Sequence, residues 1–415
     1  MSPRPGADQL VAHTTRVCAD VDLLAMAGAA GVVFSQGGNG LAGRGQALRI
    51  PLSVGPGRLT AAASDIASAL AAIERHDEVG LPGCGPVGFA ALPFTDTAPA
   101  SVVVPSLVVG RSDDGTRWMT TVAAEGSPVP PLQPMEAPAP SAPCSYRVTI
   151  PRPPGAWCDA VIRAVAAIRT GKLVKVVLAR EVVVEADATL AVADIVRRLA
   201  NAAPGAMVYA VDGLVGASPE LLVSRSGDVV RSHPMAGTTP RSGDPAADAR
   251  LGASLLASAK DRAEHQITID MVLDTVLPFC SYVDSEPEPS IVAAGNVQHL
   301  ASLVEGRLSS PSASVLALVA ALHPTPAVCG WPRAEALDLI DELEGLDRGR
   351  YAGAVGWVDA DGNGRFAVAI RGVELDGPRA RLLAGNGIVA DSDPATELAE
   401  TRSKLQAVLS AVVQP

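Results

Sequence analysis

The sequence is poor in aromatic residues, in basic charge and in long apolar runs. Aromatic side chains make up 3% of the 415 residues, and 44 acidic side chains outnumber 33 basic ones, for a formal net charge of -11. An acidic protein lacks the basic surface that nucleic acid requires, so we expect no nucleic-acid partner. No apolar run of about 18 residues free of charge or proline occurs, so we expect no membrane span.

The start of the chain and the cysteines favour a cytoplasmic protein. Residues 1–9 lack a basic segment followed by an apolar core, so no secretory signal is expected. The six cysteines are scattered and form no CxxC pair. This pattern is typical of reduced thiols and provides no zinc site.

The chain has a globular composition, because 48% of its residues are hydrophobic and 19% are charged. One segment departs from this composition. This segment is residues 127–143, which are proline-rich and aperiodic and are predicted to form a flexible insert. Short strand-like runs come before this segment, at residues 31–34, 47–51 and 102–105. After it, helices and strands alternate, which favours an α+β layered architecture.

Periodicity predicts several elements in the second part of the chain. A helix is predicted at residues 394–413, with Asp393 as its N-cap and Pro394 in the first helical position. The segments 208–211 and 221–224 are interpreted as a hairpin around Gly213. The other predicted elements are helices at 157–169 and 259–276, a strand at 174–184, and strands at 351–359 and 365–373 around a tight turn.

Two motifs look functional but are interpreted as turns. Residues 38–43 match GxGxxG, but a second strand rather than a helix is expected to follow, so a dinucleotide site is not supported. Residues 359–364 resemble the start of a calcium loop, yet the twelfth position is Ile370 instead of a bidentate glutamate. A hairpin turn is the better interpretation of this segment.

Two ionisable side chains have apolar surroundings that suit a base and an acid. Lys175 lies inside an apolar run in which both strand faces are apolar. A lysine removed from water is a usable general base, although a lysine that reaches solvent from a partly exposed strand fits the same pattern. Glu220 lies between a turn and an apolar strand, where poor solvation would raise its pKa as a general acid requires. A strand-end glutamate in water is the alternative.

The second and third predicted helices carry carboxylates at spacings that suit a divalent cation. Asp261 and Glu264 are three residues apart and share one helix face. Glu397, Glu400 and Lys404 share a face of the last helix. Mg²⁺ prefers such carboxylate oxygens. The alternatives are acids that complement a helix dipole and an ordinary i,i+4 Glu–Lys pair.

Three further features suit an anionic ligand. Residues 232–241 form a compact segment with two prolines and a glycine, which could present backbone N–H groups to an anion or be an ordinary loop. Closely spaced glycines at 383–390 would let backbone approach a ligand. Arg371, predicted at a strand end, is a candidate carboxylate clamp.

Nine segments, in order, resemble the chorismate-utilising enzymes, which are the isochorismate, salicylate, anthranilate and aminodeoxychorismate synthases. The segments are KVVLAR (175–180), GASPELLV (216–223), HPMAGTTPR (233–241), KDRAEH (260–265), NVQHL (296–300), HPTPAVCG (323–330), YAGAVGW (351–357), FAVAIR (366–371) and AGNGIVADSDPATELAETRSKL (384–405). The resemblance implies an α+β fold of two pseudo-symmetric halves, with stacked antiparallel sheets and outer helices. It further implies one domain over residues 1–415, with a weakly matching part at 1–126 and a catalytic part at 155–413.

The resemblance also implies roles for individual residues. Lys175 is similar to the base that activates water, and Glu220 to the acid that protonates a departing hydroxyl. Glu264 and Glu400 resemble Mg²⁺ ligands, with Asp261 and Glu397 nearby. The residues that resemble substrate contacts or pocket walls are Gly237, Thr238, His299, Ala327, Val328, Tyr351, Arg371, Leu383, Gly385, Gly387 and Lys404.

Three positions depart from the usual pattern of these enzymes. Leu383 stands where an aromatic residue is common, Asn386 where a small apolar residue is usual, and Thr239 where an arginine is frequent. These departures concern the shape of the pocket and leave the expected acid–base pair intact.

The HPTPA segment most resembles the isochorismate synthase branch, which implies Mg²⁺-dependent conversion of chorismate to isochorismate. The alternatives are a salicylate synthase, which goes on to eliminate pyruvate, and a non-catalytic relative that binds chorismate. A lysine at 175 suits water activation, and no glutaminase-type cysteine motif is visible, so no glutaminase subunit is expected. We expect a cytoplasmic monomer whose product serves siderophore or menaquinone biosynthesis.

Overall fold

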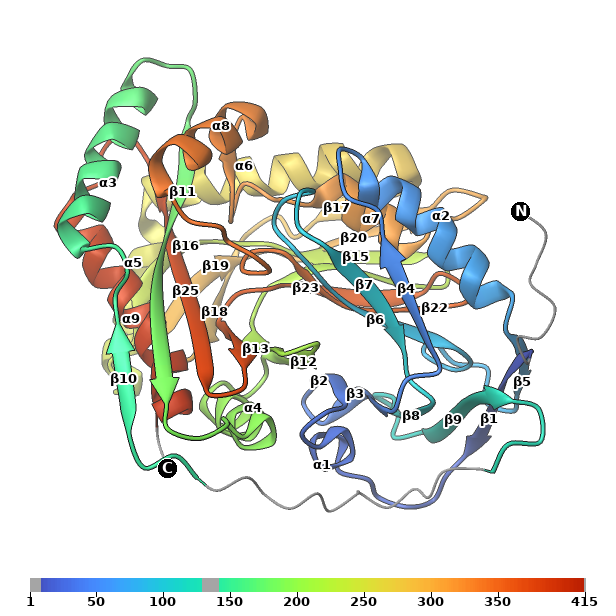
Figure 1. The fold of residues 1–415 in the computed structure, drawn as a ribbon. Coiled ribbons are helices and arrows are strands. Elements are labelled where there is room, and N and C mark those ends of the chain that lie inside the picture. Colours follow the sequence, from blue (N-terminus) through green and yellow to red (C-terminus); the bar gives the residue numbers. More distant parts are fainter. Residues whose placement is uncertain (1–8, 129–141, 414–415) are drawn as a thin grey trace.

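The computed structural model describes residues 9–128 and 142–413. Two stacked sheets form the centre, and helices cover their outer faces (Figure 1). Most of the proline-rich segment 127–143 lies outside the described residues, so its predicted flexibility stays a prediction. In the described part of the chain, no helix combines the length and the apolar character needed to cross a membrane.

The first sheet has thirteen strands among the described residues, all antiparallel except the pair β1–β5. The short β21 (Gly330–Trp331) pairs with β11 beside the edge. In spatial order, the other strands are β10 (Tyr146–Thr149), β11 (Lys175–Ala186), β25 (Arg379–Ile388), β24 (Gly372–Asp376), β13 (Leu214–Ser218), β12 (Met207–Val211), β2 (Val32–Gln36), β3 (Asn39–Arg44), β8 (Leu107–Arg111), β9 (Arg117–Ala124), β1 (Leu10–Arg16) and β5 (Glu74–Asp77).

The second sheet has nine strands in the described ranges, and a third sheet of three strands adjoins them. The strands of the second sheet are β17 (Cys280–Ser285), β20 (Val304–Leu308), β15 (Val229–His233), β14 (Leu221–Ser226), β23 (Gly364–Val368), β22 (Ala354–Asp359), β6 (Val87–Leu92), β7 (Ala100–Val104) and β4 (Leu48–Leu52). Those of the third are β16 (Met235–Pro240), β19 (Val297–Ala301) and β18 (Ser290–Ala294).

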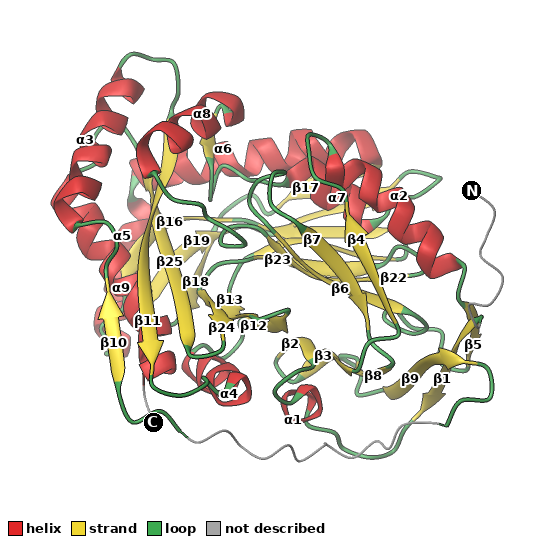
Figure 2. Cartoon of the chain, in the orientation of Figure 1, coloured by secondary structure: helices red, strands yellow, loops and turns green. Residues whose placement is uncertain are grey.

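Helices lie on both outer faces of the stack (Figure 2). The helices are α1 (Leu23–Ala27), α2 (Arg58–Ala71), α3 (Pro154–Arg169), α4 (Val192–Ala202), α5 (Pro245–Ala257), α6 (Ala259–Val276), the 3₁₀ turn Leu277–Phe279, α7 (Val315–Leu322), α8 (Arg333–Glu344) and α9 (Pro394–Val413). Helices α1, α4 and α9 pack on the first sheet, whereas α2, α6 and α7 pack beside the second. The expected α+β class with stacked antiparallel sheets and outer helices is confirmed.

The space between the two sheets is filled by large apolar side chains from both of them. Phe34 and Tyr209 come from the first sheet, and Phe89 and Trp357 from the second, and all four are at most 9% exposed. Since burial of apolar surface is the main favourable term in folding, this layer joins the sheets into one unit. Each of these two sheets contains strands from before and after the proline-rich segment.

The elements expected to carry the site form where the sequence predicts them. Helices α6 and α9 have the predicted bounds, and β11 begins at Lys175. Ser258 caps α6 by accepting a hydrogen bond from the Asp261 amide, and the Asp393 side chain accepts one from the Thr396 amide at the start of α9. Such caps satisfy N–H groups that the helix itself leaves unpaired.

The predicted hairpin of 208–211 with 221–224 is wrong. Strand β12 turns back through Asp212 and Gly213, both with positive φ, and pairs with β13. This Asp-Gly pair favours a two-residue turn whose twist suits antiparallel strands. The segment from Leu221 onward belongs to β14 in the second sheet.

The strand expected at 365–373 is present only as far as Val368, because the chain changes sheets after that residue. Strand β23 ends at Val368, and β24 begins at Gly372 in the first sheet. Arg371 therefore lies in the link, with a left-handed φ of 55°, rather than at a strand end. A positive φ in a residue other than glycine needs support from its surroundings.

The segment 232–241, expected to be compact or a loop, and the GxGxxG segment, expected to be a turn, are largely strand. Residues 232–241 form the end of β15 and all of β16, with a register shift at Gly237, whose φ is 71°. Of the GxGxxG segment, only Gly38 lies in a turn, and the remaining residues belong to β3. The calcium-like segment is a hairpin turn between β22 and β23, as expected.

A buried ion pair holds β11 against its neighbours. The Glu344 and Arg348 side chains are at most 2% exposed, and Arg348 Nε donates to Glu344 Oε2 at 2.9 Å. Glu344 Oε1 also accepts from the Ala179 amide, and Arg348 donates to the carbonyls of Val177 and Val328. Arg348 lies 4.2 Å over the ring centre of Phe94 as well. One pair thus connects β11, the segment before β21, and the loop after β6.

We expect Arg348→Met to lower the free energy of unfolding by about 3–5 kcal/mol, because it leaves a buried carboxylate without its partner. Arg163→Met is the matched control, since Arg163 pairs with Glu342 of α8 on the exposed surface. Exposed pairs contribute little. Urea unfolding of both variants measures the difference, and equal midpoints would contradict the importance of the buried pair.

Candidate active site

Every residue expected at the site lines one pocket of about 240 Å³. Strands β11 and β25 form one wall, β16 and β19 another, and helices α6 and α9 contribute carboxylates. The predicted residues on this lining are Lys175, Glu220, Gly237, Thr238, Asp261, Glu264, His299, Ala327, Val328, Tyr351, Arg371, Leu383, Gly385, Gly387, Glu397, Glu400 and Lys404. The structure therefore brings the predicted residues together, while their roles stay predictions.

Lys175 is 3% exposed, so the alternative of a solvent-reaching lysine is wrong. Its Nζ lies 2.7 Å from Glu264 Oε1 of α6. The neighbouring strand β25 makes room for the side chain with Gly387, because a Cβ at that position would lie 2.4 Å from Lys175 Cε. The ammonium group thus enters the pocket through a gap that only glycine leaves open.

Glu220 is 4% exposed and lies between β13 and β14, where the chain passes from the first sheet to the second. Burial raises its pKa to about 7, although the Lys175 charge and a hydrogen bond from the Met235 amide oppose the shift. The alternative of a water-facing glutamate is therefore wrong. A carboxyl group with this pKa holds a proton part of the time at neutral pH and can donate it.

Glu264 and Asp261 enter the pocket from the first two turns of α6. Burial tends to raise the pKa of Glu264, but the attraction of Lys175 and of two further lysines outweighs burial and holds this pKa low. Glu264 is therefore an anion at neutral pH. Gly237 lets β16 approach α6, because a Cβ there would lie 3.2 Å from Asp261 Cβ.

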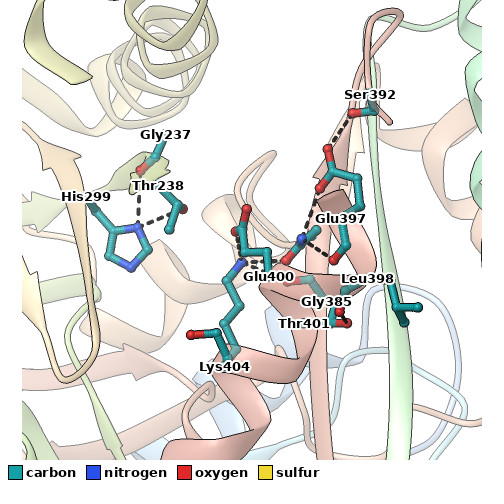
Figure 3. Close-up of polar contacts among 12 residues, drawn as sticks. Gly237, Thr238, His299, Gly385, Ser392, Glu397, Leu398, Glu400, Thr401 and Lys404 are labelled. Atoms are coloured by element: carbon teal, nitrogen blue, oxygen red, sulfur yellow. Dashed lines mark hydrogen bonds and ion pairs between the residues drawn. The ribbon is translucent and has the colours of Figure 1, made fainter. Parts of the chain in front are cut away.

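Helix α9 presents a second set of charges (Figure 3). Lys404 Nζ lies 2.7 Å from Glu400 Oε1, as the i,i+4 spacing suggests. Burial lowers the pKa of Lys404, and the Glu400 charge opposes that shift. Burial raises the pKa of Glu397, whose Oε1 accepts a hydrogen bond from Ser392 Oγ at 2.7 Å.

The chemistry of these donors suits a hard divalent cation. The carboxylates of Asp261, Glu264, Glu397 and Glu400 line one pocket, and Mg²⁺ prefers oxygen ligands. In the described ranges, no three side chains of histidine, cysteine, aspartate or glutamate are gathered closely enough to hold a metal. Glu264 and Glu400 each pair with a lysine instead, so a cation would replace these two ion pairs.

Arg371 and His299 form a polar wall of the pocket. Arg371 Nη2 lies 3.2 Å from His299 Nε2. Since a guanidinium group only donates, Nε2 accepts and Nδ1 carries the proton, which it donates to the Gly237 carbonyl at 3.2 Å (Figure 3). Burial lowers the pKa of His299 to about 3, so its ring is neutral.

Arg371 retains a donor for a ligand. Its Nη1 is buried and has no hydrogen-bond partner among the residues that the structure describes. Its unusual backbone is supported by Tyr209, whose hydroxyl donates to the Ile370 carbonyl at 2.9 Å. A buried unpaired guanidinium nitrogen is costly and suits an anionic group that would complete its hydrogen bonding.

The rest of the pocket is less polar. Ala327 and Val328 approach from the segment before β21, and Leu383 from β25. Burial raises the pKa of Tyr351 to about 12, so its hydroxyl keeps its proton. The arrangement offers a base, an acid, carboxylates and a free cationic donor around a small, partly apolar space.

Asn386 is a polar lining residue that sequence reasoning noted only as a departure from a pattern. It lies on β25 and contacts both Glu397 and Lys404. The available signal was a lone polar residue in the apolar strand 382–388. The Lys404–Glu400 ion pair was offered as an alternative because of its i,i+4 spacing. The Lys175–Glu264 ion pair was not predicted, because these two residues are far apart in the sequence.

Comparison with known proteins agrees with this geometry. The family model "Chorismate binding enzyme" matches residues 34–413. A Mycobacterium tuberculosis protein with the provisional name isochorismate synthase MenF is 40% identical over 343 residues, which cover 80% of this chain and 87% of that one. Isochorismate synthase DhbC of Bacillus subtilis is 35% identical, with 79% and 81% of the two chains covered.

A solved structure supports the fold. The menaquinone-specific isochorismate synthase MenF of Escherichia coli superposes with a TM-score of 0.79, covering 97% of this chain and 94% of that one. At 21% identity this likeness concerns the fold alone. It confirms the fold class expected from the sequence.

We predict that Glu220→Gln makes the protein more stable at pH 8 than the wild type. The folded state binds a proton with a pKa of about 7, whereas the ordinary value is 4.5. The contribution of Glu220 is therefore fully favourable below pH 4.5 and is lost as pH rises through 7. A neutral glutamine avoids the loss, so its advantage should be roughly 2–3 kcal/mol larger at pH 8 than at pH 5. Urea unfolding at both pH values measures it, and a pH-independent difference would contradict the raised pKa.

Proposed function

The chain belongs to the chorismate-binding enzyme family, and on that basis we propose that it is an isochorismate synthase, an isomerase that converts chorismate to isochorismate. The observation that carries the proposal is the presence of buried Lys175 and protonatable Glu220 in one pocket. The relatives named as isochorismate synthases support the choice within the family.

The substrate is a ring with two carboxylates, and the pocket offers cationic donors for them. The free Nη1 of Arg371 suits one carboxylate oxygen. Lys404 supplies an ammonium group to the same pocket, and Gly385 and Gly387 let the backbone of β25 approach. The neutral His299 adds no charge beside Arg371, whose free Nη1 favours an anion there.

The reaction exchanges a hydroxyl group between two ring carbons. Lys175, acting in its neutral amine form, removes a proton from a water molecule and becomes an ammonium group, and the resulting hydroxide attacks ring carbon 2. The ring double bonds shift, and the hydroxyl on carbon 4 leaves as water when Glu220 gives it a proton. The pKa of about 7 allows Glu220 to hold that proton at neutral pH. Because water is the nucleophile, the proposal includes no glutaminase subunit.

The proposal includes Mg²⁺ as cofactor, held by Glu264 and Glu400, with Asp261 and Glu397 nearby. When bound, the cation supplies positive charge that offsets the substrate carboxylate and orients it. Binding of the cation would break two observed ion pairs, since Glu264 and Glu400 each lie 2.7 Å from a lysine Nζ. Release of Glu264 would leave Lys175 free to face the water that it deprotonates.

We expect Lys175→Ala and Glu220→Gln each to lower turnover by about 10²-fold or more, because general acid–base catalysis contributes ~10²–10⁴. Lys172→Ala is the matched control, since Lys172 is exposed and lies just before β11. Steady-state rates with chorismate measure the effect. Near-normal turnover by a folded Lys175 or Glu220 variant would remove that residue from the mechanism.

Product analysis tests the proposed reaction itself. Purified protein, chorismate and Mg²⁺ should yield isochorismate in a reversible equilibrium with chorismate. Chromatography of samples taken over time measures both compounds. The small side chains of Ala327 and Val328 and the absence of an aromatic ring at Leu383 favour early release of this product. Salicylate formed together with an equal amount of pyruvate would instead identify a salicylate synthase, and binding without turnover would identify a non-catalytic relative.

We expect exhaustive chelation with EDTA to abolish activity and Mg²⁺ to restore it. Glu264→Gln and Glu400→Gln should weaken Mg²⁺ binding measured by calorimetry, because each removes a charged oxygen ligand. Substrate should strengthen the binding of the cation, since Mg²⁺ commonly shares its coordination with a ligand. Full activity after chelation would overturn the assignment of the cofactor.

A further inference from the structure

Strand β25 has one polar residue on a face that is otherwise apolar. Side chains alternate along a strand, so Leu382, Ala384, Asn386 and Ile388 share a face. Asn386 is 2% exposed, and the other three are at most 5% exposed. A buried amide without partners would be costly, so its surroundings must satisfy it.

Asn386 is satisfied by α9, and its orientation follows from the chemistry of its partners. Its Nδ2 donates to the Glu397 carbonyl and to Glu397 Oε2, both at 2.9 Å. Its Oδ1 accepts from Lys404 Nζ at 2.7 Å. A carbonyl and a carboxylate only accept and an ammonium only donates, so exchanging the amide oxygen and nitrogen would break every contact.

The amide separates a cation from a carboxylate. Lys404 Nζ donates to Asn386 Oδ1, to the Gly385 carbonyl at 3.0 Å and to Glu400 at 2.7 Å. Glu397 receives the amide on one oxygen and Ser392 on the other. All three ammonium protons and both Glu397 oxygens are therefore engaged, and Asn386 bonds to both groups.

We propose that Asn386 is a positioning residue, which keeps Lys404 away from Glu397 and directs its ammonium group into the pocket. Two of the three Lys404 acceptors belong to β25 and are held by the sheet. Glu400 is the remaining acceptor, and it is the one that a substrate carboxylate can replace. Without the amide, Lys404 would pair with Glu397 and present its charge to the substrate less well. This inference rests on the proposed role of Lys404 toward chorismate.

The test compares Asn386→Ala with Ile388→Val, which removes buried volume from the same strand face without removing a hydrogen bond. Asn386→Ala should raise the KM for chorismate by about 10-fold with kcat changed by less than about 3-fold, since a hydrogen bond to a charged group is lost. Ile388→Val should leave KM unchanged. In a Lys404→Met background, Asn386→Ala should have no further effect on KM.

Equal KM values for the wild type and Asn386→Ala would overturn the inference, as would equal effects with and without Lys404. A ligand-free crystal structure of Asn386→Ala provides a second measurement that does not depend on turnover. Movement of Lys404 Nζ toward Glu397 supports the inference, and an unchanged position overturns it. If the wild type neither binds nor converts chorismate, the proposed function fails, whereas the crystallographic result still judges the role of Asn386.

Discussion

The buried Arg348–Glu344 pair is the interaction on which the geometry of the pocket depends. It holds the backbone of β11 at Val177 and Ala179, on the strand that carries Lys175, and it holds the carbonyl of Val328 at the pocket wall. Its contact with Phe94 extends this support to the part of the chain before residue 126. Catalytic geometry in the second part of the chain therefore depends on packing against the first part.

The pocket gathers many charges, yet it keeps them locally balanced. Lys175 and Lys404 are each paired with a carboxylate, and the amide of Asn386 separates Lys404 from Glu397. Buried charges are tolerated only when paired or hydrogen-bonded, so the fold can assemble this site before any ligand arrives. The uncompensated donor is on Arg371, and it marks the place for substrate charge. The formal charge of -11 therefore says little about the local field.

Sequence reasoning recovered the helices α6 and α9, the strand β11 and the set of pocket residues, because periodicity, caps and ordered motifs are local signals. It failed where the chain changes sheets. It paired residues 221–224 with the wrong strand and continued one strand through the link at Arg371, since apolar alternation does not say which sheet a strand joins. Contacts between residues far apart, such as Lys175 with Glu264 and Asn386 with α9, depend on tertiary packing and leave no local pattern.

The two large sheets are each built from both parts of the chain, and this has a consequence for synthesis on the ribosome. One edge of strand β6 pairs with β22. After Leu92 has been synthesised, that edge stays unpaired until Ala354 and the following residues have been made. At ~5–20 residues per second, that interval is on the order of 10 s or longer. One edge of strand β2 likewise stays unpaired until β12 has been made. An open strand edge can pair with another chain, so the nascent N-terminal part has to be kept from aggregating until its C-terminal partners emerge.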